Sequence, residues 1–168
     1  FAFNELKKDL GILIDINRIE TYDVSHFSGD NAIASCVVYS KTGSCKKDYR
    51  LFNIPKEFSG NDIGSLENVL NRRLKHFANN VMKPELILID GGKTQLKFTR
   101  SIIKNSIHDD IKVISIAKGV NRLRAAETIL SANGIVDLNK YSKSYLLLQE
   151  MRDEAHRFAI SAQRKKKA

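Results

Sequence analysis

The stretch ELILIDGG at residues 85–92 decides the fold of this chain of 168 residues. Its almost continuous apolar run is typical of a strand that is buried on both faces within a parallel sheet. The paired glycines end that strand, so Asp90 stands at its carboxyl end, where open α/β sheets hold their ligands. A phosphate-binding Walker A loop is excluded, because GxxxxGK[ST] would require glycine at the position of Ile87.

The segments on either side of this strand predict a mixed sheet with helices on its faces. Three extended segments joined by short connections precede it and favour an antiparallel meander. Apolar residues at helical spacing alternate with extended segments around and after it. The expected strands are 18–25, 32–39, 47–54, 85–90 and 112–117, with a hairpin at 127–131 and 134–138, and the expected helices are 1–11, 62–78, 93–105 and 142–159. We therefore expect one α/β domain over residues 1–160, followed by a basic linker or tail at 161–168.

Composition narrows the classes of function. The 28 Lys and Arg against 19 Asp and Glu give a formal net charge of +9, which favours a polyanionic partner such as nucleic acid, an anionic membrane or an acidic protein. No apolar run is long enough for a transmembrane helix, and no signal peptide opens the chain, which begins with Phe1 and is expected to be a fragment. Cys36 and Cys45 form no metal-binding pattern, and Cys36 is expected to pack as a small hydrophobic residue. Because no disulfide is expected, the cytoplasm is the expected location.

For two further acidic residues, the sequence leaves open whether the side chain binds a metal or has only a structural role. Asp23 falls inside the first expected strand, where aspartate is disfavoured and its burial is costly unless something pairs with it. It is either a turn-side residue that bonds the backbone or a metal ligand. Asp62 begins the helix at 62–78, where a stabilising N-terminal charge is the favoured interpretation and a third metal-assisting carboxylate the alternative.

His156 lies in the sequence RDEAHRFAI, on the last expected helix. Its spacing from Arg152 and Asp153 places all three on one helix face. That face is either a solvated polar surface, or it turns His156 toward the two strand carboxylates, where a histidine can handle protons or bind a metal.

Basic residues follow one face of the helix that begins beside Asp90. They are Lys93, Lys97, Arg100 and Lys104, and we refer to them as the basic stripe. The stripe is either a solvated surface or a path for a phosphate backbone. Further positive charge comes from Arg72, Arg73, Lys75, Lys118, Arg122, Arg124 and the terminal run at 164–167. These basic residues, together with Asp23, Asp90 and His156, suit the hydrolysis of a phosphodiester bond. Aspartate oxygens can hold Mg²⁺ or Mn²⁺, and lysines attract the negatively charged nucleic acid.

Several strings resemble the C-terminal endonuclease domain of the UvrC family of excinucleases. They are RIETYDVSHFSGDNAIASCVVY, DYRLFNI, LENVLNRRL, LILIDGGKTQL, AKG and RDEAHRFAI, in the family's order and spacing over about residues 5–167. The resemblance implies a ribonuclease H-like fold and a metal-dependent endodeoxyribonuclease, which makes the 5′ incision in bacterial nucleotide excision repair. It further implies Mg²⁺ or Mn²⁺ as cofactor, damaged double-stranded DNA in its complex with UvrB as substrate, no membrane partner, and a monomer as an isolated domain.

By this resemblance Asp23, Asp90 and His156 correspond to the family's active site, with Asp23 and Asp90 as metal ligands and Asp62 as a further acidic position. We also expect Arg157, Arg164 and Lys165 to join the basic stripe in binding DNA. The chain departs from the family at Thr94, Ala126 and Gln163, and at the turn 59–62, which reads SGND where the family has PGDD.

The family's GIY-YIG nuclease, UvrB-contacting segment and helix-hairpin-helix repeats are not in this sequence, so we expect weak DNA binding and poor cutting by the chain alone. Two other hypotheses remain open. One is a non-catalytic DNA-binding platform of the repair complex. The other is a ribonuclease or transposase-like relative, because contacts to the 2′-hydroxyl decide between RNA and DNA.

Overall fold

The computed structural model describes residues 2–26, 32–58, 60–77, 82–118 and 127–167. Over these residues the chain forms one mixed eight-stranded sheet in the order β3-β2-β1-β5-β6-β7-β8, with β4 paired to β2. The strands are β1 (Arg18–His26), β2 (Ala32–Ser40), β3 (Gly43–Ser44), β4 (Arg50–Ile54), β5 (Leu86–Asp90), β6 (Lys112–Lys118), β7 (Glu127–Ser131) and β8 (Gly134–Val136). The helices are α1 (Ala2–Asp9), α2 (Asp62–Phe77), α3 (Lys93–Lys104) and α4 (Lys143–Lys167), with 3-10 turns η1 (Lys46–Asp48) and η2 (Lys56–Phe58).

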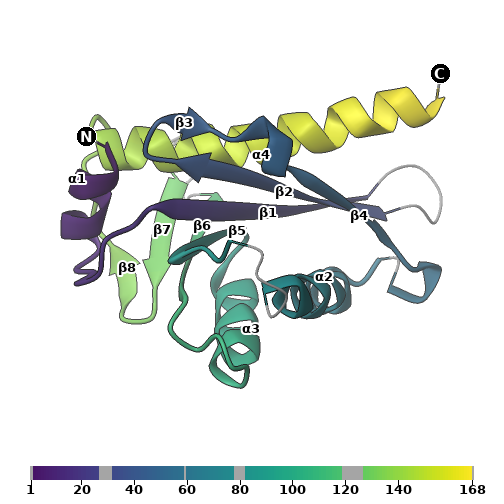
Figure 1. The fold of residues 1–168 in the computed structure, drawn as a ribbon, viewed down its shortest axis with the longest axis horizontal. Helices are drawn as coiled ribbons and strands as arrows, with labels where there is room; N and C mark the ends of the chain where they lie inside the picture. Colours follow the sequence, from purple (N-terminus) through teal and green to yellow (C-terminus); the bar gives the residue numbers. More distant parts are fainter. Residues whose placement is uncertain (1, 27–31, 59, 78–81, 119–126, 168) are drawn as a thin grey trace.

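Helices cover both faces of this sheet (Figure 1). The long helix α4 lies along one face and packs on β1 and β2, whereas α2 and α3 lie together on the other face. The pairs β1/β2 and β2/β4 are antiparallel, as the predicted meander requires, and β1, β5 and β6 run parallel. The predicted α/β mixed sheet flanked by helices is therefore confirmed.

The third expected strand starts later than predicted. Residues 46–48 form the turn η1, in which the amide of Asp48 donates to the carbonyl of Cys45 (2.9 Å), and β4 begins at Arg50. The expected connection at 41–44 also contributes the short strand β3. Tyr49, between η1 and β4, packs edge-on against Phe158 of α4, and this tertiary contact overrides the extended pattern of the local sequence.

Helix α4 is longer than expected. The predicted end at residue 159 is wrong, because α4 continues through Lys167 and includes most of the stretch that we expected to be a basic tail. Alanine, glutamine, arginine and lysine are good helix formers. Cations in a last turn also interact favourably with the negative end of the helix dipole. The basic run at residues 164–167 therefore continues helix α4 instead of forming a separate tail.

A buried ionic cluster lies between the sheet and α2. The Glu20 side chain on β1 is fully buried and accepts hydrogen bonds from Nε (3.1 Å) and Nη2 (3.0 Å) of Arg73. Arg18 Nε (3.2 Å) and the Tyr22 hydroxyl (2.5 Å) also donate to this carboxylate. Arg73, which the sequence offers as one of several further positive charges, is buried as the partner of Glu20 and adds no free surface charge. Arg122 and Arg124 lie outside the described residues.

Cys36 is fully buried, as expected for a small hydrophobic residue, and burial raises the pKa of its thiol well above the usual range. Cys36 and Cys45 are both unpaired thiols. Of the helices in the described parts of the chain, none combines the length and the apolar character that crossing a bilayer requires.

Candidate active site

Asp23 and Asp90 lie at neighbouring positions of two adjacent parallel strands. The register pairs Tyr22 of β1 with Ile89 of β5, so the next residue along each strand brings Asp23 beside Asp90. Side chains alternate along a strand. Tyr22 contacts Glu20 on the α2 face, so Asp23 is on the α4 face. The parallel strands therefore present two carboxylates side by side beneath α4, one within β1 and one at the carboxyl end of β5.

The Asp23 carboxylate is held by two polar groups. The Ser25 hydroxyl donates to Oδ2 of Asp23 (3.0 Å), and Nδ1 of His156 lies 3.4 Å from the same oxygen. The Asp23 side chain is 8% exposed, whereas that of His156 is 60% exposed. The structure thus places His156 against one of the two strand carboxylates, Asp23, and its role there stays a prediction. An ionised carboxylate can only accept, so Nδ1 of His156 is the donor in this contact.

Asp90 is exposed at the strand end but titrates abnormally. Desolvation by the surrounding protein and the negative charge of Asp23 raise the pKa of Asp90 from 3.8 to about 6. The carboxylate of Glu127 also contributes to this increase, while the Arg152 cation opposes it. Desolvation and a nearby like charge both disfavour the ionised form of a carboxyl group.

Glu127 and Arg152 belong to this site, and the sequence did not reveal Glu127. Glu127 begins β7, where its amide donates to the Tyr145 hydroxyl (2.7 Å) and its side chain forms an ion pair with Arg152 of α4. The second carboxylate oxygen of Glu127 is buried, and within the described part of the chain it has no hydrogen-bond partner. The helical spacing of Arg152 and His156 was a usable signal, but no local pattern links Glu127 to the two strand aspartates far earlier in the chain.

Asp62 occupies the first position of α2, as expected for a residue that stabilises a helix N-terminus. Its carboxylate forms an ion pair with Nε2 of His26, at the end of β1. Its side chain is 60% exposed. Among the hydrogen bonds and ion pairs of the described residues, none joins Asp62 to Asp23, Asp90 or His156. The role of Asp62 in the site therefore stays a prediction.

The turn after Asp90 is shaped by its glycines. The amide of Gly91 donates to the carbonyl of Ile116 (3.0 Å), and the amide of Gly92 donates to Oε1 of Gln95 (3.1 Å) in the first turn of α3. A Cβ atom at Gly91 would lie 2.9 Å from Cγ of Gln95, so a larger residue there would displace Gln95. The tight turn places α3 on the opposite face of the sheet from α4.

The side chains of this site could supply only some of the ligands that a hard divalent cation needs. In the described portion of the chain, no three His, Cys, Asp or Glu side chains gather closely enough to enclose a metal ion. Mg²⁺ is usually bound by one or two protein carboxylates, with waters and substrate phosphates completing its shell. The pair of carboxylates formed by Asp23 of β1 and Asp90 at the end of β5 matches that pattern.

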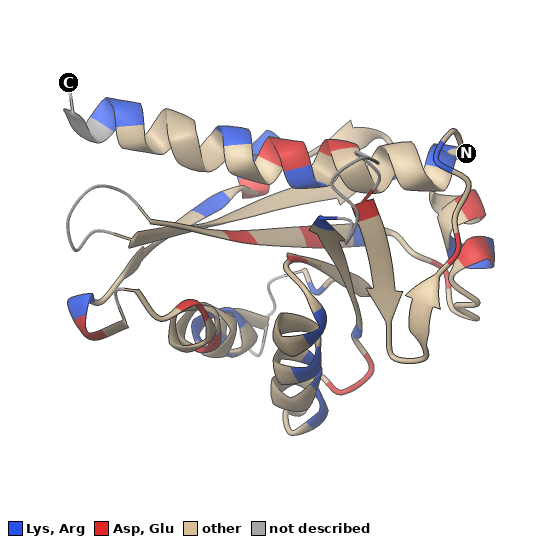
Figure 2. Ribbon diagram, turned by 180° about the vertical axis from the view of Figure 1, so that it is seen from behind, with Lys and Arg blue, Asp and Glu red and all other residues tan. Residues whose placement is uncertain are grey.

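The basic residues divide between two regions (Figure 2). Lys93 begins α3, three residues after Asp90, and Arg164 and Lys165 are exposed near the end of α4. Arg157 pairs with Glu154 through Nε (2.5 Å) and Nη2 (2.9 Å). The other stripe residues, Lys97, Arg100 and Lys104, line a separate groove on the α3 face. Their assignment to DNA stays a prediction.

The chain has a ribonuclease H-like fold, a mixed sheet of parallel and antiparallel strands flanked by helices. Human ENDOV superposes with a TM-score of 0.57 at 14% identity, covering 91% of this chain and 87% of ENDOV. Endonuclease V from Bacillus subtilis superposes with a TM-score of 0.52 at 12% identity, covering 98% of this chain and 91% of that one. These likenesses concern the fold alone.

The family follows from the sequence relatives. A family model described as UvrC RNAse H endonuclease domain matches residues 7–160, and the chain belongs to this family. UvrABC system protein C from Saccharophagus degradans is 38% identical over 167 residues, covering 98% of this chain and 27% of the relative. The same protein from Francisella tularensis is 37% identical over 164 residues, covering 96% of this chain and 27% of the relative. The chain thus spans about a quarter of the length of these curated relatives.

Proposed function

We propose that this chain is a metal-dependent DNA endonuclease domain that hydrolyses a phosphodiester bond in nucleotide excision repair and makes the 5′ incision beside a lesion. The observation that carries this proposal is the register of β1 and β5, which brings Asp23 and Asp90 together beneath His156. Membership of the UvrC endonuclease domain family supports the repair context.

Asp23 and Asp90 would hold Mg²⁺ or Mn²⁺. Two neighbouring carboxylates repel each other, and the raised pKa of Asp90 reflects desolvation together with this repulsion. A divalent cation bound there would neutralise the scissile phosphate and activate the attacking water. The buried, unpartnered oxygen of Glu127 adds negative potential to the same region without contacting either aspartate directly in the described contacts.

His156 is placed to move a proton beside this pair. Its Nδ1 contacts Asp23, which fixes the tautomer and leaves Nε2 able to accept a proton from water or to contact a phosphate oxygen. The ring is largely exposed, so a substrate can reach it. The Ser25 hydroxyl donates to the same oxygen of Asp23 that His156 contacts, which helps to hold the carboxylate in place.

DNA would approach along the carboxyl ends of the parallel strands. Lys93, at the first position of α3, and Arg164 and Lys165, exposed near the end of α4, would supply positive charge for the phosphate backbone. Arg157 would contribute once a phosphate competes with Glu154 for its guanidinium. Damaged duplex DNA in its complex with UvrB is the proposed substrate, which follows from the name of the relatives, UvrABC system protein C.

The test is metal binding and cleavage by wild type, Asp23→Asn and Asp109→Asn. Asp109 is exposed in the loop before β6, at the opposite ends of the parallel strands, so its variant is the charge-matched control. We expect Mn²⁺ binding to the chain, measured by calorimetry, and Mn²⁺-dependent nicking by a reconstituted repair complex that contains the chain, to be lost in Asp23→Asn and kept in the control. Equal Mn²⁺ binding by the two variants, with equal nicking by their complexes, would instead favour a non-catalytic platform that positions DNA for another nuclease.

A further inference from the structure

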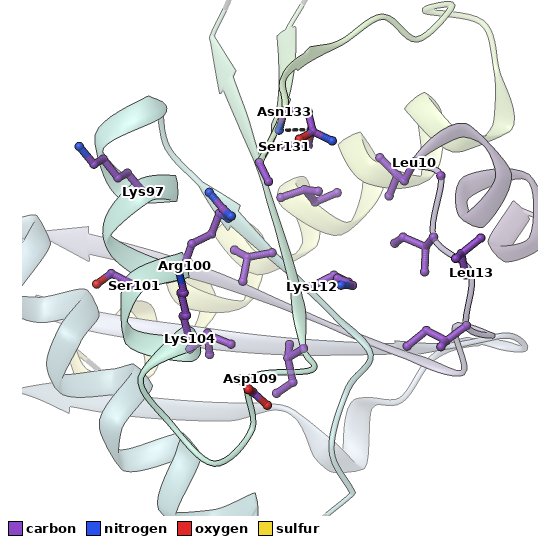
Figure 3. A pocket seen from close by; sticks show the side chains of 18 residues that line it. Leu10, Leu13, Lys97, Arg100, Ser101, Lys104, Asp109, Lys112, Ser131 and Asn133 are labelled. Carbon is purple, nitrogen blue, oxygen red and sulfur yellow. Dashed lines mark hydrogen bonds between the residues drawn. The ribbon is translucent and has the colours of Figure 1, made fainter.

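A large groove lies on the α3 face of the sheet, away from the aspartate pair (Figure 3). Its volume is about 880 Å³, and four segments form it: the linker between α1 and β1, helix α3, the loop and strand at residues 109–114, and the β7–β8 turn at residues 131–133. Asp23 and Asp90 face α4 on the opposite side of the sheet. An occupant of the groove and a substrate at the aspartate pair would therefore not compete for the same surface.

One wall of the groove is cationic. Lys97, Arg100 and Lys104 of α3 and Lys112 of β6 line it, against a single acid, Asp109. All four cations are exposed. Within the described ranges, none of these four forms an ion pair with a carboxylate. The wall thus carries unneutralised positive charge, which favours an acidic occupant.

The facing wall is aliphatic and open. Leu13 is 93% exposed and Ile14 is 46% exposed, and Leu10 and Ile12 continue the same segment. Figure 3 shows Leu13 across the groove from Arg100 and Lys104. Exposed aliphatic side chains beside a groove are typical of a surface that another protein covers, because burying them is favourable.

We propose that this groove binds an acidic, aliphatic segment of a partner protein. Aliphatic side chains of the segment would cover Leu13 and Ile14, and its carboxylates would pair with Arg100 and Lys104. Nucleic acid fits this surface less well, because single strands bind through stacking on aromatic rings and the groove is lined by aliphatic and basic residues with no aromatic ring among them. A duplex backbone would use the cations and leave Leu13 uncovered.

The experiment measures fluorescence anisotropy of labelled peptides with the chain. The probe is an amphipathic peptide built from Leu and Glu. Matched peptides replace every Glu by Lys, or every Leu by Ser, and a labelled DNA duplex is the fourth ligand. We expect the Leu/Glu peptide to bind, and both matched peptides to bind at least about tenfold more weakly, since covering a leucine side chain contributes about one order of magnitude in affinity or more.

Three variants locate the binding. Leu13→Ser should weaken the Leu/Glu peptide about tenfold, and its exposure means that folding is unaffected. Arg100→Glu should weaken it as well and reduce its salt dependence, because three cations of the wall remain. Lys75→Glu, which reverses an exposed charge on α2, is the matched control and should change nothing.

Two results would overturn the proposal. One is that the Leu/Glu peptide binds no better than the matched peptides, or binds equally to Leu13→Ser. The other is that DNA binding falls with Arg100→Glu and is insensitive to Leu13→Ser while the peptide does not bind, which would assign the cationic wall to nucleic acid. Neither readout depends on metal or on cleavage, so the test is independent of the proposed nuclease activity.

Discussion

Replacing Asp90 by asparagine should stabilise the folded chain at neutral pH. The pKa of Asp90 is raised from 3.8 to about 6 by desolvation and by the charge of Asp23. Each pH unit of difference corresponds to about 1.4 kcal/mol, so the whole shift would be worth about 3 kcal/mol. Because Asp90 is exposed at the strand end, solvent screening reduces the expected effect to about 1 kcal/mol.

The sign follows from proton binding. Between pH 3.8 and about 6 the folded state binds more protons at Asp90 than the unfolded state does, so the stability of wild type falls as pH rises through this window. The Asp90→Asn variant has no titrating group at this position, so it does not lose this stability as the pH rises. Its advantage should therefore be complete above about pH 7, shrink as pH falls through about 6 and vanish near about pH 4.

The assay is thermal and urea unfolding, followed by circular dichroism across this pH range, for wild type, Asp90→Asn and the control Asp109→Asn. An increase of about 1 kcal/mol should raise the melting temperature of a domain of this size by about 2–4 °C. Added Mn²⁺ should stabilise wild type and leave Asp90→Asn unchanged. A variant that is less stable than wild type at neutral pH, or a difference that does not vary with pH, would refute the reasoning.

Three further outcomes follow from the same contacts. Arg152→Gln removes a cation that lowers the pKa of Asp90, so NMR titration should place that pKa above about 6, and an unchanged value would contradict the assignment. Arg73→Met leaves the Glu20 carboxylate buried with fewer donors and should lower the free energy of unfolding in urea by about 3–5 kcal/mol, whereas a loss below about 1 kcal/mol would show that the cluster is solvated. Lys165→Ala should weaken DNA binding and reduce the slope of log affinity against log salt by about 1, and an unchanged slope would remove Lys165 from the DNA path.

Most of the strands could be predicted, because the local pattern of apolar residues indicates which segments are buried. The run at residues 85–90 is apolar on both faces because α4 covers one side of β5 and the other helices cover the opposite side. The meander could be recognised from short connections. Asp23 could be singled out because an aspartate inside an apolar strand needs a partner, and the structure supplies Ser25 and His156.

The features that could not be predicted depend on contacts between distant segments. The Glu20–Arg73 pair joins residues 53 positions apart, and charge counting alone does not distinguish a buried, paired Arg73 from a free cation. Glu127 reaches Arg152 only because β7 pairs antiparallel with β6 and packs beside α4. The length of α4 was missed because a run of lysines and arginines is compatible with either a solvated tail or a helical last turn.

The central claim is that this chain carries the catalytic centre of a DNA endonuclease at Asp23 and Asp90. The most direct measurement is 5′ incision of a lesion-bearing duplex by a reconstituted repair complex that contains this domain. It compares wild type with Asp90→Asn, each with Mg²⁺, with Mn²⁺ and with a chelator. The account predicts metal-dependent 5′ cutting by wild type and none by Asp90→Asn, although the variant is folded. Equal 5′ cutting by both proteins would contradict it and would leave the domain as a platform that positions DNA for another nuclease.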